Sequence, residues 1–319
     1  MGFMRKADFE LYRDADKHYN QVLTTRDFLA LGVGTIISTS IFTLPGQVAA
    51  QFAGPGVVFS YLLAALVAGF VALAYAEMST VMPFAGSAYS WISVLFGEGF
   101  GWIAGWALLA EYFIAVAFVG SGFSANLQQL LAPLGFHLPK VLANPFGTDG
   151  GVVDIISLLV ILLSAIIVFR GASDAGRISQ ILVVLKVAAV IAFIIVGITV
   201  IKPANYHPFI PPHNPKTGFG GFSGIWSGVS MIFLAYIGFD SIAANSAEAK
   251  NPQKTMPRGI IGSLLIAVVL FAAVTLVLVG MHPYSAYAGN AAPVGWALQQ
   301  SGYSCLLYTS PSPRDVEES

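Results

Sequence analysis

The sequence predicts an all-α integral membrane protein, because of its composition, its long apolar stretches and two interruptions within them. Of the 319 residues, 56% are hydrophobic and 10% are charged, whereas about 25% of residues are charged in a typical soluble domain. Seven stretches approach the length of roughly 20 apolar residues that a helix needs to cross a bilayer. Strands of an outer-membrane barrel are about half as long. The seven stretches are therefore predicted to be helices.

The expected spans follow one another within residues 28–302, after a charged segment, residues 1–27, that lacks the apolar core of a secretory signal peptide. We place them at 28–51, 57–76, 101–124, 152–170, 180–201, 223–247 and 259–281. Segment 77–100 is amphipathic and is expected at the membrane interface. The connections 125–151 and 202–222 are rich in Pro, Gly and Asn, which predicts turns.

Lysines and arginines fall mainly in alternate loops, which predicts the orientation. With the N terminus inside, ten lie on the cytoplasmic side and three on the outer side. This excess predicts a cytoplasmic N terminus. Seven spans then place the C terminus outside, and a polar Ser- and Pro-rich stretch follows Gly302. We expect residues 303–319 to be a non-native tail and exclude them from the fold.

The first interruption is GTIISTSIF, residues 34–42, inside a span without formal charge. Non-helical backbone at membrane depth is tolerated where it lines a cavity or a binding site. The N–H groups of the second half-helix favour an anion such as a carboxylate, and the freed carbonyls of the first half can hold an ammonium group. An amino acid carries both groups. The alternative is an intact helix whose small residues let a neighbouring helix approach.

The second interruption lies in the sixth span, where Ala235, Gly238 and Asp240 occur together. Two broken spans separated by four intact ones match a five-helix unit repeated in inverted orientation, with the first helix of each unit discontinuous. This pattern is typical of secondary transporters.

Four motifs identify a family. They are GVGTIISTSIFTLPG at 32–46, YAEMSTVMPFAGSAYSW at 75–91, GWALLAEY at 105–112 and FLAYIGFDSIAANSAEAKNPQKTMPRGI at 233–260. With them, residues 22–302 resemble an amino acid permease of the amino acid, polyamine and organocation (APC) superfamily, close to the bacterial cationic amino acid transporters. The resemblance implies a five-plus-five inverted-repeat, leucine-transporter-like fold with helices 1 and 6 discontinuous. Because the family has further spans, it also implies a chain truncated after about seven helices.

The sequence departs from the family pattern at both breaks. Ser38 and Ser40 stand where glycines are common, and Leu234 replaces an aromatic residue. Serine adopts unusual backbone angles less readily than glycine, and leucine would form a weaker lid over a substrate.

The predicted substrate site uses mainly the backbone of the two breaks. Its residues are Ile37, Ser38, Thr39, Ser40 and Ile41 in the first break, Leu234, Ala235, Tyr236 and Ile237 in the second, and Glu111 near the middle of the third span. Helix-break or gating positions are Gly34, Gly238 and Asp240. The alternative for Glu111 is a structural hydrogen bond to a neighbouring helix. The alternative for Asp240, which we favour, is the N-cap of the second half-helix.

Lys186 lies in an otherwise uncharged fifth span. One interpretation is that its long side chain snorkels to the headgroups. The other is a proton carrier, since burial makes a lysine easier to deprotonate. The resemblance favours the second, because proton-coupled members of the family place a lysine at this point. We therefore expect Lys186 to be the proton-coupling residue.

The function that the resemblance implies is secondary active transport of amino acids across the plasma membrane by alternating access, with proton-coupled uptake. Exchange, and transport of polyamines or other amines, are alternatives within the superfamily. A seven-helix receptor-like protein would fit the span count but not the orientation. An enzyme is not expected, because no HExxH, GxSxG or paired-aspartate motif occurs within a span.

The expected partners are an amino acid substrate, the proton and the lipid bilayer. With a net charge of -1, the chain has no electrostatic basis for binding nucleic acid. One cysteine and five scattered histidines indicate no metal site or other cofactor.

Overall fold

The structure is a computed structural model of the chain that describes residues 5–132, 135, 137–148, 150–170 and 172–302. The segment expected to be a non-native tail, 303–319, lies outside the described residues. As predicted, the described residues form helices and no β-strand; one isolated bridge pairs Leu23 with Ala249.

The long helices are α4 (Val57–Val81), α6 (Glu98–Leu131), α8 (Ile155–Arg170), α9 (Ala172–Thr199), α10 (Gly221–Phe233) and α12 (Pro252–Met281). The shorter ones are α1 (Phe9–Ala15), α2 (Thr25–Ile36), α3 (Ser40–Val48), α5 (Ser87–Leu95), α7 (Lys140–Ala143), α11 (Phe239–Ala244) and α13 (Pro293–Gln300). Single helical turns occur at Asp16–His18, Ala49–Ala53, Gly54–Gly56, Pro203–Tyr206, Leu234–Tyr236, Ser246–Glu248 and Tyr284–Tyr287.

Five segments of the described chain are long and apolar enough to cross a membrane. They are Ser40–Val81, Glu98–Leu131, Ile181–Thr199, Gly221–Ala244 and Pro252–Met281, and the apolar helix Ile155–Phe169 is shorter. The first of these segments joins α3 to α4 and leaves out α2, which has 12 residues.

Four helices are longer than the spans predicted from apolar residues: α9 and α12 begin earlier, and α4 and α6 end later. The prediction ended the second span at residue 76, but α4 continues to Val81; it ended the third at 124, but α6 continues to Leu131. Polar residues in these extensions bond back to their own helix, for example Asn126 Nδ2 to the carbonyl of Gly122 at 2.8 Å. Polar residues indicate where a helix leaves the apolar region of the membrane. The backbone hydrogen bonds of the helix can continue beyond that point.

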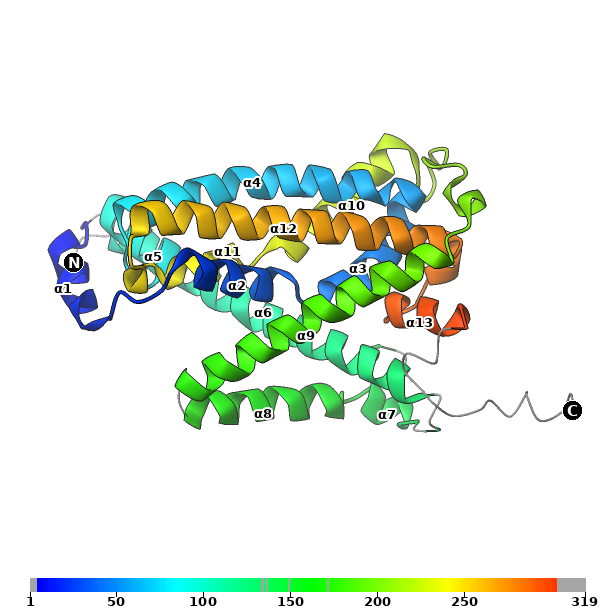
Figure 1. Cartoon of the computed structure of the whole chain (residues 1–319), viewed down its shortest axis with the longest axis horizontal. Coiled ribbons are helices and arrows are strands. Elements are labelled where there is room, and N and C mark those ends of the chain that lie inside the picture. The colour runs from blue at the N-terminus through cyan, green and yellow to red at the C-terminus, as the bar shows by residue number, and fades with distance from the viewer. Residues whose placement is uncertain (1–4, 133–134, 136, 149, 171, 303–319) are drawn as a thin grey trace, which may run out of the picture.

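The core is a layer in which α4 and α12 run side by side, with α2 and α10 packed against them (Figure 1). Small residues at every fourth position of α4, namely Ala64, Ala68, Ala72 and Ala76, are at most 3% exposed. Because alanine has so short a side chain, the backbones of neighbouring helices approach closely along this stripe. Close packing of this kind gives a rigid frame around the interrupted helices.

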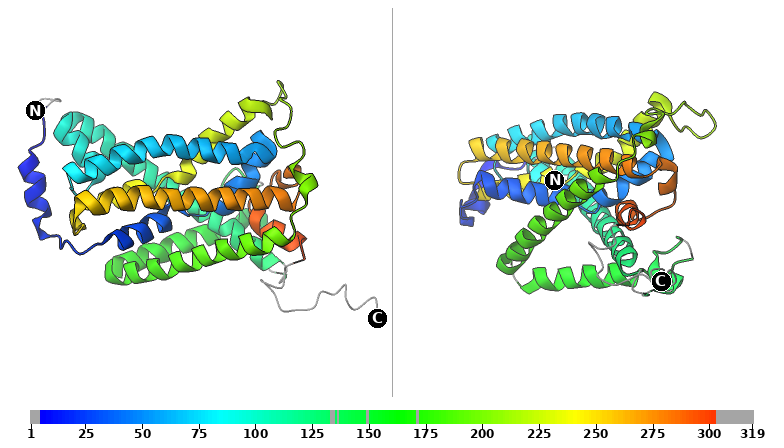
Figure 2. Two further views of the ribbon diagram at one scale, coloured as in Figure 1. Left: turned by 45° about the horizontal axis from the view of Figure 1, so that its top comes forward. Right: turned by 45° about the vertical axis from the view of Figure 1, so that its right-hand side comes forward.

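Helices α6, α8 and α9 lie beside this layer. Figure 2 shows α8 apart from the layer, connected to it through α9 and α6. In the most apolar stretch of α6 only 6% of the residues are buried, against 56% in α12. Helices α8 and α9 also expose many large apolar side chains, so this whole side of the described chain is open.

The glycines at 220, 224 and 228 face neighbouring segments of the chain and not an open surface. All three are buried. A Cβ added at Gly228 would lie 2.8 Å from Ser60 Oγ and 2.9 Å from a methyl carbon of Val48. The glycine face of α10 is already occupied by α3 and α4.

We predict that Gly228→Ala lowers the stability of the protein by about 1–3 kcal/mol, because the added methyl group overpacks the contact with Ser60 and Val48. The measurement is the unfolding temperature of the purified protein in detergent. Gly69→Ala in α4 is the matched control, since nothing lies within 4 Å of its added Cβ. There the gain in helix propensity should leave stability unchanged or about 1 kcal/mol higher. Equal unfolding temperatures for the two variants would contradict the prediction.

Candidate functional site

The first helix break lies between α2 and α3. Helix α2 ends at Ile36 and α3 begins at Ser40. The backbone N–H of Ser40 donates to Ser38 Oγ at 3.3 Å, and the two serine hydroxyls are 2.9 Å apart. Ser38, one of the two serines that replace the usual glycines, therefore supplies an acceptor for the first N–H group of α3.

The second break lies between α10 and α11. After the turn Leu234–Tyr236, Ile237 is extended and Gly238 has a φ of 137°, a conformation open to glycine but strained for other residues. A Cβ at Gly238 would also lie 3.1 Å from the backbone nitrogen of Ile36. Gly238 is required both for its dihedral angle and for the close approach of the other break.

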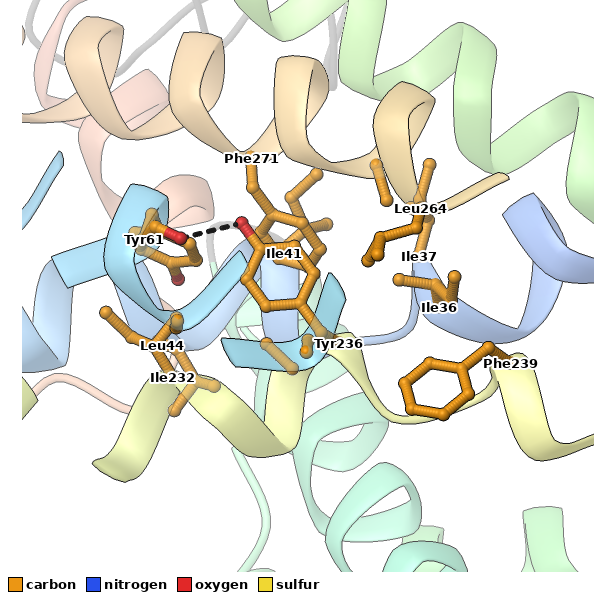
Figure 3. Close-up of a cluster of buried hydrophobic side chains, with 14 of the residues drawn as sticks. Ile36, Ile37, Ile41, Leu44, Tyr61, Ile232, Tyr236, Phe239, Leu264 and Phe271 are labelled. Carbon is orange, nitrogen blue, oxygen red and sulfur yellow. Dashed lines mark hydrogen bonds between the residues drawn. The ribbon is translucent and has the colours of Figure 1, made fainter. Parts of the chain in front are cut away.

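The two breaks are in contact. The hydroxyl of Thr35, in the last turn of α2, lies 3.1 Å from the carbonyl oxygen of Gly238. It also lies 3.0 Å and 3.1 Å from the carbonyls of Leu31 and Gly32 in its own helix, so its one proton is shared among three acceptors. Figure 3 shows Ile36, Ile37 and Ile41 of the first break beside Tyr236 and Phe239 of the second. The chain thus brings two unwound backbone segments, about 200 residues apart in sequence, to one place.

Lys186 of α9 reaches the first break. Its Nζ donates to the carbonyl of Gly34 at 2.7 Å and to that of Ile37 at 3.0 Å. Both carbonyls lie where α2 ends, so the ammonium group provides donors for acceptors at the open end of a helix. Negative partial charge at a helix C-terminus also favours a cation there.

Two acidic residues were expected near the breaks, and the structure connects one of them to a residue that the sequence analysis missed. The Tyr112 hydroxyl of α6 donates to Asp240 Oδ2, and Asp240 is only 4% exposed. Gly238 occupies the N-cap of α11, so the expected N-cap role of Asp240 is wrong. Glu111, adjacent to Tyr112, is half-buried and close enough to Asp240 for their charges to interact. The pair Glu111–Tyr112 was visible in the GWALLAEY motif, but only its carboxylate was considered.

The predicted substrate-binding residues differ in exposure. Ile37, Ser40, Ile41, Ala235 and Tyr236 are at most 2% exposed, whereas Leu234 is 63% exposed. The ring of Tyr236 lies among the buried side chains of α4 and α12 (Figure 3). Because these values describe whole residues, both the side chain and the backbone are covered at the five buried positions.

A cavity of about 570 Å³ lies beyond the first break, between α3, α6 and the segments 137–148 and 289–292. Carboxamides are frequent in its lining and include Gln47, Gln51, Gln128, Gln129, Asn144 and Asn290. None was singled out from the sequence, although amides inside apolar helices were a usable signal. Among the described residues, no three His, Cys, Asp or Glu side chains are grouped so that they could hold a metal ion.

Comparison with known proteins gives a family and several relatives. The family model of amino acid permeases matches residues 23–309. The chain is 99% identical over 306 residues to the branched-chain amino acid permease BcaP of Lactococcus lactis subsp. cremoris (strain MG1363), which covers 96% of this chain and 66% of that protein. It is 40% identical over 291 residues to the methylthioribose transporter of Bacillus subtilis (strain 168), covering 91% of this chain and 61% of that protein.

A plant relative matches over a similar stretch. Cationic amino acid transporter 4, vacuolar, of Arabidopsis thaliana is 32% identical over 297 residues, which cover 90% of this chain and 47% of that protein. The chain therefore spans between 47% and 66% of the length of these three relatives.

We predict that Thr35→Val destabilises the protein by about 0.5–1.5 kcal/mol, because it removes the hydroxyl that links the two breaks without changing side-chain size. The matched control is Thr43→Val, since the Thr43 hydroxyl bonds only within its own chain segment, to the carbonyl of Thr39 at 3.2 Å. Thermal unfolding of both purified variants measures the difference. An unfolding temperature for Thr35→Val at or above that of Thr43→Val would count against a link between the breaks.

Proposed function

The chain belongs to the amino acid permease family, as its motifs predicted, and on that premise we propose that it forms the substrate-binding part of a secondary transporter for branched-chain amino acids. The observation that carries the proposal is the contact between two unwound helix segments, linked by Thr35 and Gly238, with Lys186 at the end of one of them. The proposed substrate follows from the 99% identical branched-chain amino acid permease. We propose uptake across the plasma membrane by alternating access, driven by protons.

Backbone polarity at the breaks suits both charged groups of an amino acid. The start of α3 presents backbone N–H groups and the positive end of its helix dipole, which favour a carboxylate. The carbonyls released at Leu234–Tyr236 favour an ammonium group, whereas those of Gly34 and Ile37 at the end of α2 already accept from Lys186. We assign substrate binding to residues 37–41 and 234–237, with Glu111 on the facing helix α6.

Lys186 supplies the proposed coupling to protons. As an ammonium group it makes two charge-assisted hydrogen bonds to Gly34 and Ile37, which hold the end of α2 in place. Loss of the proton weakens both bonds and frees the break to change its geometry. Because linkage is reciprocal, a substrate that favours the held geometry also raises the affinity of Lys186 for the proton.

The proposed orientation places α1 and the first 27 residues in the cytoplasm. The bias of ten basic residues against three supports this assignment. Figure 1 shows α1 and α5 at one end of the bundle and α13 at the opposite end. In this orientation α13 and the cavity of about 570 Å³ belong to the outer side.

We predict that leucine uptake is inhibited by isoleucine and valine but poorly by 3-methylbutylamine, the decarboxylated form of leucine, because the amine lacks the group that the start of α3 would bind. The test uses a full-length protein that contains this chain, such as the 99% identical permease, reconstituted in liposomes. An imposed proton gradient drives the uptake of leucine. Equal inhibition by leucine and the amine would exclude carboxylate recognition. Inhibition by methylthioribose and not by isoleucine would replace the proposed substrate with that of the 40% identical relative.

A further prediction concerns Lys186 in the same full-length protein. Lys186→Ala and Lys186→Gln should abolish accumulation driven by a proton gradient, because neither side chain can load and release a proton. Lys186→Arg should bind substrate but stay locked, since a guanidinium group keeps its proton. Uptake into vesicles with and without an inward proton gradient measures the effect. Gradient-dependent accumulation by the Ala and Gln variants would remove Lys186 from the coupling step.

A further inference from the structure

Tyr236 lies in the second break, and its side chain extends from there into the buried core. It is 0% exposed, and its ring lies between α4 and α12. We propose that Tyr236 is a positioning residue. Its hydroxyl group anchors the backbone of the second break to α4 and thereby sets the affinity for substrate. The inference rests on the proposed binding of substrate by the breaks. It assigns a role to the side chain of Tyr236, in addition to the role already proposed for its backbone.

The hydroxyl of Tyr236 is tied to a rigid element. Its Oη donates to the backbone carbonyl of Tyr61 in α4 at 3.2 Å, a buried hydrogen bond between residues 175 positions apart. Figure 3 shows this bond crossing the apolar core. In an environment without water, a hydroxyl that lost its acceptor would be costly to bury. The bond therefore restricts where the ring of Tyr236 can lie.

Two neighbouring aromatic rings restrict both the position and the orientation of the Tyr236 ring. The ring of Tyr236 meets Phe271 of α12 edge-to-face, with centroids 5.3 Å apart and planes at 63°. It meets Tyr61 in the same manner at 6.4 Å and 79°. Tyr61 and Phe271 stack on each other at 5.3 Å and 21°. All three rings are 0% exposed, so the cluster ties the break to both helices of the frame.

The backbone around Tyr236 has few regular helical hydrogen bonds to stabilise it. Tyr236 ends a single helical turn, and it is followed by extended Ile237 and by Gly238 at a φ of 137°. A glycine next to an extended residue loses much conformational entropy when it is ordered. Side-chain contacts therefore contribute to the ordering: the hydroxyls of Thr35 and Ser241 lie within hydrogen-bond distance of the Gly238 carbonyl, and the hydroxyl of Tyr236 bonds to α4.

The same cluster contains a matched control. Tyr61 is as buried as Tyr236, and its own hydroxyl lies near the hydroxyl of Thr275 in α12 without a well-aligned hydrogen bond. Tyr61 takes part in the bond to Tyr236 through its backbone carbonyl, which Tyr61→Phe leaves in place. The two substitutions remove the same atom from adjacent rings, and only one of them removes a hydrogen bond to the break.

The experiment compares Tyr236→Phe with Tyr61→Phe in a full-length protein that contains this chain, reconstituted in liposomes. For Tyr236→Phe we expect the KM for leucine to rise about two- to tenfold, the factor that one net hydrogen bond provides, with the maximal rate per folded protein kept. For Tyr61→Phe we expect an unchanged KM. An unchanged KM for Tyr236→Phe, or an equal rise for both variants, would overturn the proposal.

Hydrogen–deuterium exchange of residues 234–240 in detergent gives a second readout that needs no substrate. We expect exchange there to be about two- to tenfold faster in Tyr236→Phe than in Tyr61→Phe. If the unmodified protein does not transport leucine, the proposed substrate is wrong and exchange alone decides the role of Tyr236. Equal exchange in both variants would then reject the positioning role.

Discussion

Backbone polar groups inside the bilayer must find partners within the protein, and this constraint governs the whole arrangement around the two breaks. A lipid tail offers neither donor nor acceptor, so each unpaired group costs several kcal/mol, roughly. The chain meets the requirement with side chains from several helices: Lys186 at the end of α2, the serines at the start of α3 and the Thr35 hydroxyl at Gly238. The breaks persist because these partners are fixed by the surrounding helices.

The surroundings divide into a well-packed frame and a loosely covered side. On one side, α4 and α12 present small residues and complementary aromatic rings to the interrupted helices, and almost nothing there is exposed. On the other, α6 carries Glu111 and Tyr112 on a helix that is mostly uncovered in this chain. Groups that must stay fixed are thus anchored on the frame. Polar groups suited to exchange with water or a ligand lie on the opposite helix.

Sequence patterns were informative where a residue was out of place in an apolar helix. Small and hydroxyl-bearing residues at 34–40 located the first break, and a single charge in α9 drew attention to Lys186. The ring direction of Tyr236 and the bond from Tyr112 to Asp240 were not predictable, because membrane helices are apolar on all sides and their periodicity does not reveal which face is buried. Helix ends were missed for a related reason, since hydropathy reports the thickness of the bilayer and not the end of hydrogen bonding.

The serines of the first break have a consequence for speed as well as for structure. Ser38 and Ser40 already bond to each other and to the backbone before any ligand is bound, so the loop has fewer conformations to lose on binding than a glycine loop would have. A smaller entropy loss favours tight binding. In the proposed transport cycle, the same restraint would raise the barrier to rearranging the loop when substrate is released, so affinity would be gained at the expense of turnover.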